Sequence, residues 1–140
     1  MCAADVKADF NMTEKTKATV EEAQPTLGVH CFSERVFEQA VHFQVLKLKD
    51  SFFLWVGLQP SMANLAVALP ARFDSIPSTS ALLGEFSDTT SCTLAQKLCK
   101  HTGKQVFVSC NLPTQDGMFL VEVEKRIHKE IKDNPEKFWL

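Results

Sequence analysis

The strongest constraint on the fold of this chain is a pair of strand-forming runs separated by only two residues, Lys49 and Asp50. The first run covers residues 38–48, and the second is Ser51–Gly57, which reads SFFLWVG. Both runs are rich in β-branched and aromatic residues, and two such runs joined by a two-residue connection predict a β-hairpin. The chain is therefore expected to build its core on a sheet whose register starts at this turn.

The predicted hairpin has two faces of different composition. With Leu48 opposite Ser51, Gln44 pairs with Trp55. One face is continuously apolar and is expected to receive helices: Val41, Phe43, Val45, Phe52, Leu54 and Val56. The other face mixes aromatic, aliphatic and polar groups, which is the composition of a protein interface. We predict that the partner interface is formed on this second face by His42, Gln44, Leu46, Phe53 and Trp55.

The remaining segments predict an α+β domain. Further strands are expected at residues 29–32, Leu65–Leu69 and Gln105–Asn111, and helices at residues 89–102 and from about residue 117 to 135. The hairpin and Leu65–Leu69 are expected to form an antiparallel meander. The prediction is a single, mostly antiparallel sheet of five or six strands, with two helices covering one face and the other face available for dimer pairing.

Composition divides the chain into a tail and a domain. Residues 1–27 are mainly Ala, Asp, Glu, Lys and Thr with few large apolar groups, which predicts a disordered N-terminal tail. Residues 28–138 are expected to form one compact domain, as suits a chain of 140 residues.

Charge and cysteine usage narrow the function classes. Lys and Arg number 15 and Asp and Glu number 17, so the net charge of -2 provides no positive field for nucleic acid. The five cysteines form an odd set without a Cys-x-x-Cys pair, and neither a secretory signal nor a long apolar span precedes them. We expect a reducing compartment, cytoplasmic or nuclear, no membrane association and no metal site.

A cluster of hydroxyl residues around Asp88 supports two interpretations. Asp88-Thr89-Thr90-Ser91 is similar to the Asp-Thr-Gly-Ser loop of aspartic proteases, but Thr90 stands where that loop has glycine. Ser, Asp and Thr also accept hydrogen bonds from the free N–H groups at a helix start. We predict a helix cap formed by Ser87, Asp88 and Thr90, with no catalytic residue; the alternative is a small hydrolase that uses Asp88 or Cys92.

Three long strings of this sequence resemble the proteasome assembly chaperone 4 family. They are EQAVHFQVLKLKDSFFLWVG (residues 38–57), NLAVALPARFDSIPSTSALLGEFSDTTSCTLAQKLCKHTGKQVFVSCNL (residues 64–112) and NPEKF (residues 134–138). The resemblance implies a chaperone that pairs with proteasome assembly chaperone 3 as a heterodimer. It also implies binding to alpha-type subunits during assembly of the alpha ring of the 20S core particle, and release before maturation.

The same resemblance implies no enzymatic activity, no cofactor and no small-molecule substrate. A trafficking-type adaptor domain with the same sheet and helices remains a further alternative. The long connection at residues 70–86 is expected to carry the contact with the alpha-type subunits through Arg72, Phe73, Asp74 and Ile76. Phe73 and Ile76 would alternatively cap an open sheet edge, and the terminal Phe138-Trp139-Leu140 is a weaker candidate for a contact.

Overall fold

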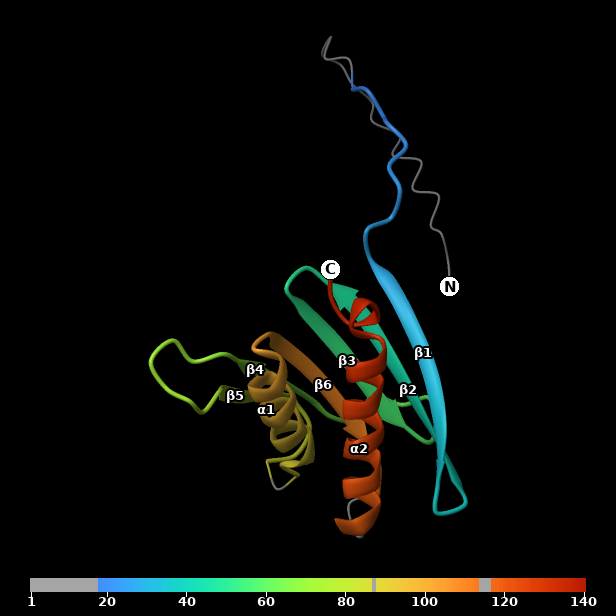
Figure 1. Ribbon diagram of the computed structural model, residues 1–140, viewed down its shortest axis with the longest axis vertical. Helices are drawn as coiled ribbons and strands as arrows, with labels where there is room; N and C mark the ends of the chain where they lie inside the picture. The colour runs from blue at the N-terminus through green and yellow to red at the C-terminus, as the bar shows by residue number, and fades with distance from the viewer. Residues whose placement is uncertain (1–17, 87, 114–116) are drawn as a thin grey trace.

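The structure, a computed structural model, describes residues 18–86, 88–113 and 117–140. In this part of the chain one sheet carries two helices on one side (Figure 1). The elements are β1 (Gly28–Val36), β2 (Gln39–Leu48), β3 (Ser51–Gly57), β4 (Leu65–Leu69), β5 (Ser78–Leu83), α1 (Thr90–Thr102), β6 (Gln105–Asn111), α2 (Gly117–Asp133) and the 3-10 turn η1 (Pro135–Lys137). The six strands lie in the order β1-β2-β3-β6-β4-β5. The predicted α+β class, with one mostly antiparallel sheet, is confirmed.

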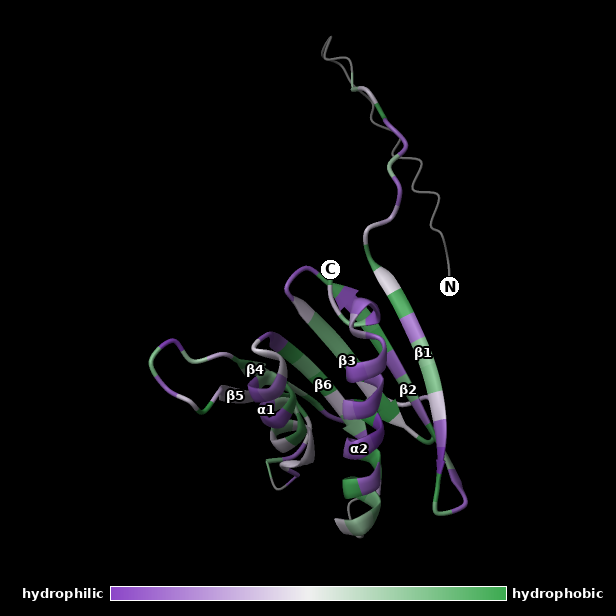
Figure 2. Cartoon of the chain, viewed as in Figure 1, coloured by the Kyte–Doolittle hydropathy of each residue, from purple (hydrophilic) through white to green (hydrophobic). Residues whose placement is uncertain are grey.

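The hairpin of β2 and β3 has the predicted register. Leu48 lies opposite Ser51 and Gln44 opposite Trp55. The predicted apolar face is buried throughout, and with α1, α2, β4 and β6 it forms the core: Val41, Phe43, Val45, Phe52, Leu54 and Val56. Figure 2 shows this separation, because β3 and β6 are largely hydrophobic where the helices cover them and the helices carry hydrophilic residues on their outer sides. Each fully buried side chain of this size stabilises the fold by about 2 kcal/mol through apolar burial.

The predicted meander is wrong at its third strand. β4 does not pair with β3; instead β6 lies between them, parallel to β3 and antiparallel to β4. Parallel strands need a long crossover, and here the crossover consists of β4, β5 and α1. Gly103 ends α1 in the left-handed conformation, with φ 70°, and turns the chain into β6. The turn residues after β3 predict that the chain reverses there. They contain no information about which strand pairs with β3.

The prediction that residues 70–86 form only a long connection is also wrong. Residues 78–83 form β5, which pairs with β4 at the end of the sheet. All six residues of β5 are exposed, so its sequence, STSALL, lacks the alternation by which a half-buried strand is recognised. β1 is likewise longer than expected, because its second half follows β2 as an exposed edge.

The C-terminal residues complete the core instead of forming a free contact segment. Phe138 is fully buried, and its ring meets that of Phe52 edge to face, with centroids 5.4 Å apart. Trp139 forms a parallel bridge with Leu48, and the Leu140 N–H donates to the Leu48 carbonyl at 3.1 Å. The expectation that this terminal segment is a candidate for an outside contact is therefore wrong for Phe138.

Candidate protein-interaction surface

The side of the sheet opposite the helices is called the open face here. Side chains alternate along a strand, so the residues between the buried ones point to this side. Strand pairing aligns an apolar row across five strands: Val29, Leu46, Phe53, Phe107 and Val67. All five side chains are partly or largely exposed. A continuous row of half-exposed aromatic and aliphatic groups is what a protein partner buries.

Trp55 is an aromatic group of the open face that is held by two contacts within the chain. Its Nε1–H donates to the Ser61 carbonyl at 2.8 Å. Its ring lies over Gly57, since a Cβ built at that position would be only 2.6 Å from Cζ2 of the ring. One hydrogen bond and one packing contact thus fix the ring in the free chain. This lowers the entropy that is lost when a partner binds.

Shallow hollows flank Trp55 on both sides. One has a volume of about 390 Å³ and is lined by Gln44, Phe53, Trp55, Pro60, Ser61 and Met62. The other has a volume of about 330 Å³ and is lined by Cys31, Phe32, Ser33, His42, Phe43, Gln44 and Trp55. Four of the five predicted interface residues therefore line these hollows, and the fifth, Leu46, lies beside Phe53 in the apolar row.

The four predicted contact residues of the connection lie together on the loop between β4 and β5. The Arg72 guanidinium sits 5.4 Å from the centre of the Phe73 ring, and 95% of Phe73 is exposed. Asp74 Oδ1 accepts the Ile76 N–H at 3.2 Å, which shapes the turn. The loop projects well beyond the sheet (Figure 1). These residues form a separate surface from Trp55, at the far edge of the sheet.

Asp88 is engaged at the start of α1. Its Oδ1 accepts the Thr90 N–H at 3.1 Å and its Oδ2 accepts the Asn64 Nδ2–H at 3.2 Å. Thr90 is the first helical residue and acts as donor, while the preceding Thr89 makes no side-chain capping bond. Ser87 lies outside the described residues. The Asp88 carboxylate thus links the start of α1, through one oxygen, to the β3–β4 connection, through the other.

The hydroxyl and thiol groups near Asp88 also have structural contacts. The Ser91 hydroxyl is buried and accepts the Cys110 N–H at 3.0 Å. Burial raises the pKa of the Cys110 thiol to about 12, so this group stays protonated at neutral pH. Cys92, the other nucleophile considered, is half-buried on the first turn of α1.

A charged network that the sequence analysis did not predict joins β1 to α2. Arg126 donates from Nε to Glu34 at 2.9 Å and from Nη1 to Glu130 at 2.7 Å. His30 Nε2 lies 2.8 Å from the other oxygen of Glu130. Burial raises the pKa of the Glu130 carboxyl, but the hydrogen bonds from His30 and Arg126 outweigh it, so the pKa lies below its ordinary value.

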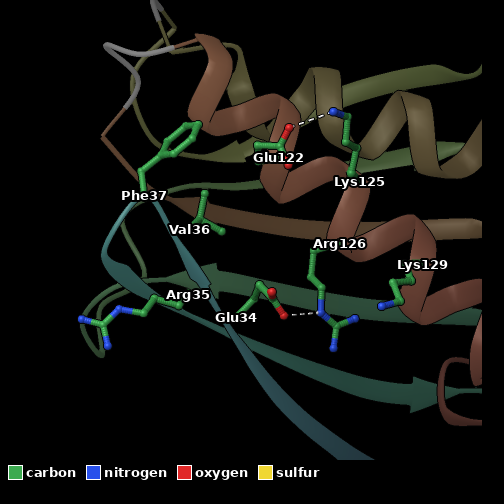
Figure 3. A pocket seen from close by; sticks show the side chains of 8 residues that line it. All are labelled: Glu34, Arg35, Val36, Phe37, Glu122, Lys125, Arg126 and Lys129. Atoms are coloured by element: carbon green, nitrogen blue, oxygen red, sulfur yellow. Dashed lines mark hydrogen bonds and ion pairs between the residues drawn. The ribbon is translucent and has the colours of Figure 1, made fainter.

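Figure 3 shows the groove that this network borders, with the Glu34–Arg126 and Glu122–Lys125 ion pairs drawn. Its volume is about 370 Å³, and it is lined by Glu34, Arg35, Val36, Phe37, Glu122, Lys125, Arg126 and Lys129. The i,i+4 spacing of Arg126 and Glu130 is visible in the sequence. Their partners on β1 are about a hundred residues away, which is why the network was missed.

Metal binding and disulfide formation find no support in the described ranges. No three side chains of the metal-binding types lie together there, and Cys31, Cys92, Cys99 and Cys110 are free thiols. Among the same residues, neither helix has the length and apolar character needed to cross a lipid bilayer.

An α+β sheet with one face covered by helices, and with a fixed tryptophan beside an apolar row on the other face, has the architecture of a domain that binds protein. Residues 40–112 match the family model described as "Proteasome assembly chaperone 4". Human proteasome assembly chaperone 4 is 54% identical over 112 residues, which are 80% of this chain and 91% of the human protein. The mouse protein of the same name is 52% identical over 116 residues, covering 83% and 94% of the two chains. The chain belongs to the proteasome assembly chaperone 4 family.

A solved structure shares the fold. It is described as a novel chaperone complex for yeast 20S proteasome assembly, and one of its chains superimposes with a TM-score of 0.52 and 19% identity. The superposition covers 77% of this chain and 95% of the yeast chain. At this identity the likeness shows a common fold.

Proposed function

We propose that this chain pairs with proteasome assembly chaperone 3 and that the heterodimer promotes assembly of the alpha ring of the 20S core particle. In this proposal the chain binds alpha-type subunits and is released before maturation. The observation that carries the proposal is the open face, whose apolar row and fixed Trp55 suit a permanent partner. Membership of an assembly-chaperone family makes a related chaperone the natural partner.

The proposed partner interface has an aromatic centre and a polar border. Trp55, Phe53 and Leu46 would be buried at the centre, and His42 and Gln44 would lie beside them and set the orientation of the partner. A second sheet stacked on the open face would lie about 10 Å away, at the spacing of packed sheets. Such stacking leaves the helices and the β4–β5 loop accessible.

We propose that the β4–β5 loop carries the contact with alpha-type subunits. Phe73 and Ile76 are largely exposed, Arg72 and Asp74 add one charge of each sign, and the loop that carries them extends away from the sheet (Figure 1). A later subunit that competes for this surface would displace the chaperone without nucleotide hydrolysis. The proposed role is therefore non-enzymatic, in keeping with the structural use of Asp88.

The proposal places the chain in the cytoplasm or nucleus, where proteasomes assemble. The experiment that tests it is co-purification of the full-length chain from cells, followed by mass spectrometry of the proteins that remain bound. Proteasome assembly chaperone 3 and a subset of alpha-type subunits are expected, without the mature core particle. Recovery of the chain with trafficking proteins, or with the mature core particle only, would contradict it.

A further inference from the structure

The sheet has two edge strands, and β1 is protected. The second half of β1 carries the charged pair Glu34 and Arg35, and Glu34 is held by Arg126. His30, nearer the start of β1, is bonded to Glu130 of α2. Charged side chains and contacts with a neighbouring element are the usual means by which an edge strand is kept from pairing with another chain.

The opposite edge, β5 (Ser78–Leu83), lacks the charged side chains that protect β1. It contains no charged residue and no proline, and all six of its residues are exposed. Residues 78–81 pair with β4 in regular register, and the irregularity is confined to the other end of the strand. Among the described residues, no backbone hydrogen bond other than those of the sheet reaches β5.

The β5 edge is supported from behind and bordered by apolar groups. α1 packs on its inner face, where Gln96 donates to the carbonyl of Pro77 at 3.3 Å, just before the strand. Exposed apolar side chains surround the strand in sequence and in the sheet: Leu69, Phe73, Ile76, Leu82, Leu83 and Phe86. An uncharged edge strand with outward-facing backbone groups and apolar neighbours is a template for an added strand.

We propose that the β5 edge accepts an extended strand of an alpha-type subunit. The strand that fits is uncharged and has small or apolar side chains at alternate positions, since β5 has no charge to pair with. The alpha-type subunit is chosen over the chaperone partner because β5 directly follows the loop assigned to the alpha-type subunit, whereas the partner is assigned to the open face. This inference rests on the proposed function and adds the mode of binding.

Strand addition has a consequence for specificity. Backbone hydrogen bonds provide affinity with little dependence on the added sequence, and side-chain pockets provide the selection. The edge would therefore supply affinity for related subunits, and the loop with Arg72 and Phe73 would choose among them.

The test is amide hydrogen exchange measured on the full-length chain alone, with proteasome assembly chaperone 3, and with that chaperone plus purified alpha-type subunits. Exchange at residues 78–83 is expected to slow only when the alpha-type subunit is added, while exchange at β1 stays unchanged by that addition. Thr79→Lys, which adds the charge that natural edges use on the side of β5 away from the open face, is expected to weaken alpha-subunit binding about tenfold and to leave the chaperone pair intact. Thr93→Lys, which adds the same charge on α1, is the matched control and should bind normally.

The outcomes separate the two proposals. If the alpha-type subunit binds but residues 78–83 exchange as fast as in the free chain, the strand addition is wrong and the proposed function stands. If β5 is protected by the chaperone partner alone, the assigned occupant is wrong. If no alpha-type subunit binds the heterodimer at all, both the proposed function and this inference are wrong.

Discussion

The indole ring of Trp55 rests directly on Gly57, two residues along the same strand. A methyl group at Gly57 would lie 2.6 Å and 2.8 Å from Cζ2 and Cη2 of the ring. The ring is also tied to the Ser61 carbonyl by its Nε1–H, and the residue as a whole is partly exposed. The absence of a side chain at residue 57 is therefore a condition for the shape of the open face.

Replacing Trp55 with Ala is expected to weaken pairing with the chaperone partner by about 2 kcal/mol or more, because a buried aromatic anchor is lost. Sedimentation of the heterodimer over a range of concentrations measures this. Phe73→Ala, at an exposed aromatic of the β4–β5 loop, is the control and should leave the dissociation constant unchanged. Equal dissociation constants for wild type and a folded Trp55→Ala chain would exclude the open face as the interface.

Gly57→Ala is expected to weaken the same pairing although it removes no contact group. The added methyl displaces the Trp55 ring from its resting position. Tryptophan fluorescence of the isolated chain should shift along with the affinity, because the indole environment changes. A variant with weaker pairing but unaltered fluorescence would show that the ring position is not the cause.

Asp88→Ala is expected to lower the free energy of unfolding by about 1 kcal/mol, since the helix start loses its acceptor and the favourable charge near the dipole. Thermal unfolding followed by circular dichroism measures the change. Partner binding should survive. A variant of full stability that loses a hydrolytic activity of the wild type would revive the hydrolase alternative.

Removing Phe138, Trp139 and Leu140 is expected to destabilise the whole domain. Phe138 is fully buried against Phe52, and Phe→Ala changes in a core cost about 3–5 kcal/mol. Chemical denaturation of Phe138→Ala tests this with the chain length preserved. Leu140→Ala is the control, because 47% of Leu140 is exposed and its side chain contributes little. A free terminal segment would instead make both variants equally stable.

Acid is expected to weaken the link between β1 and α2. The pKa of Glu130 is lower in the folded chain than in the unfolded chain, so its stabilising contribution is fully present above the unfolded value. It is lost as the pH falls through the lower, folded value. Unfolding measured from pH 6 to pH 3 should show less acid destabilisation in Glu130→Gln than in the wild type. Identical pH profiles would contradict the assignment.

A double variant, Arg72→Glu with Phe73→Ala, is expected to keep the chaperone partner and to lose alpha-type subunits. Both side chains are exposed, so the fold does not need them. Pull-down of each partner with the purified variant distinguishes the two contacts. Loss of the chaperone partner would show that the loop supports the fold or the dimer instead.

The hairpin could be predicted in full because the information for it is local. A period of two residues assigns each side chain of β2 and β3 to a face, and a two-residue connection leaves one register that keeps the apolar set together. The helices were equally visible from their apolar spacing and from Gly103. The composition of the open face, and with it Trp55 as an interface residue, followed from the same alternation.

The features that only the tertiary structure decided depend on contacts between segments far apart in the sequence. The insertion of β6 between β3 and β4 is favoured by the complete burial of Val106 and Val108 under the helices, and no turn signal encodes it. β5 is a strand because it pairs with β4 through backbone hydrogen bonds. All its residues are exposed, so its sequence has no alternating pattern that would predict a strand. The bonds between β1 and Glu130, and the burial of Phe138, likewise exist only once the chain is folded. Periodicity and turn chemistry act within a few residues, whereas strand order and ion pairing are set by the packing of the whole sheet against its two helices.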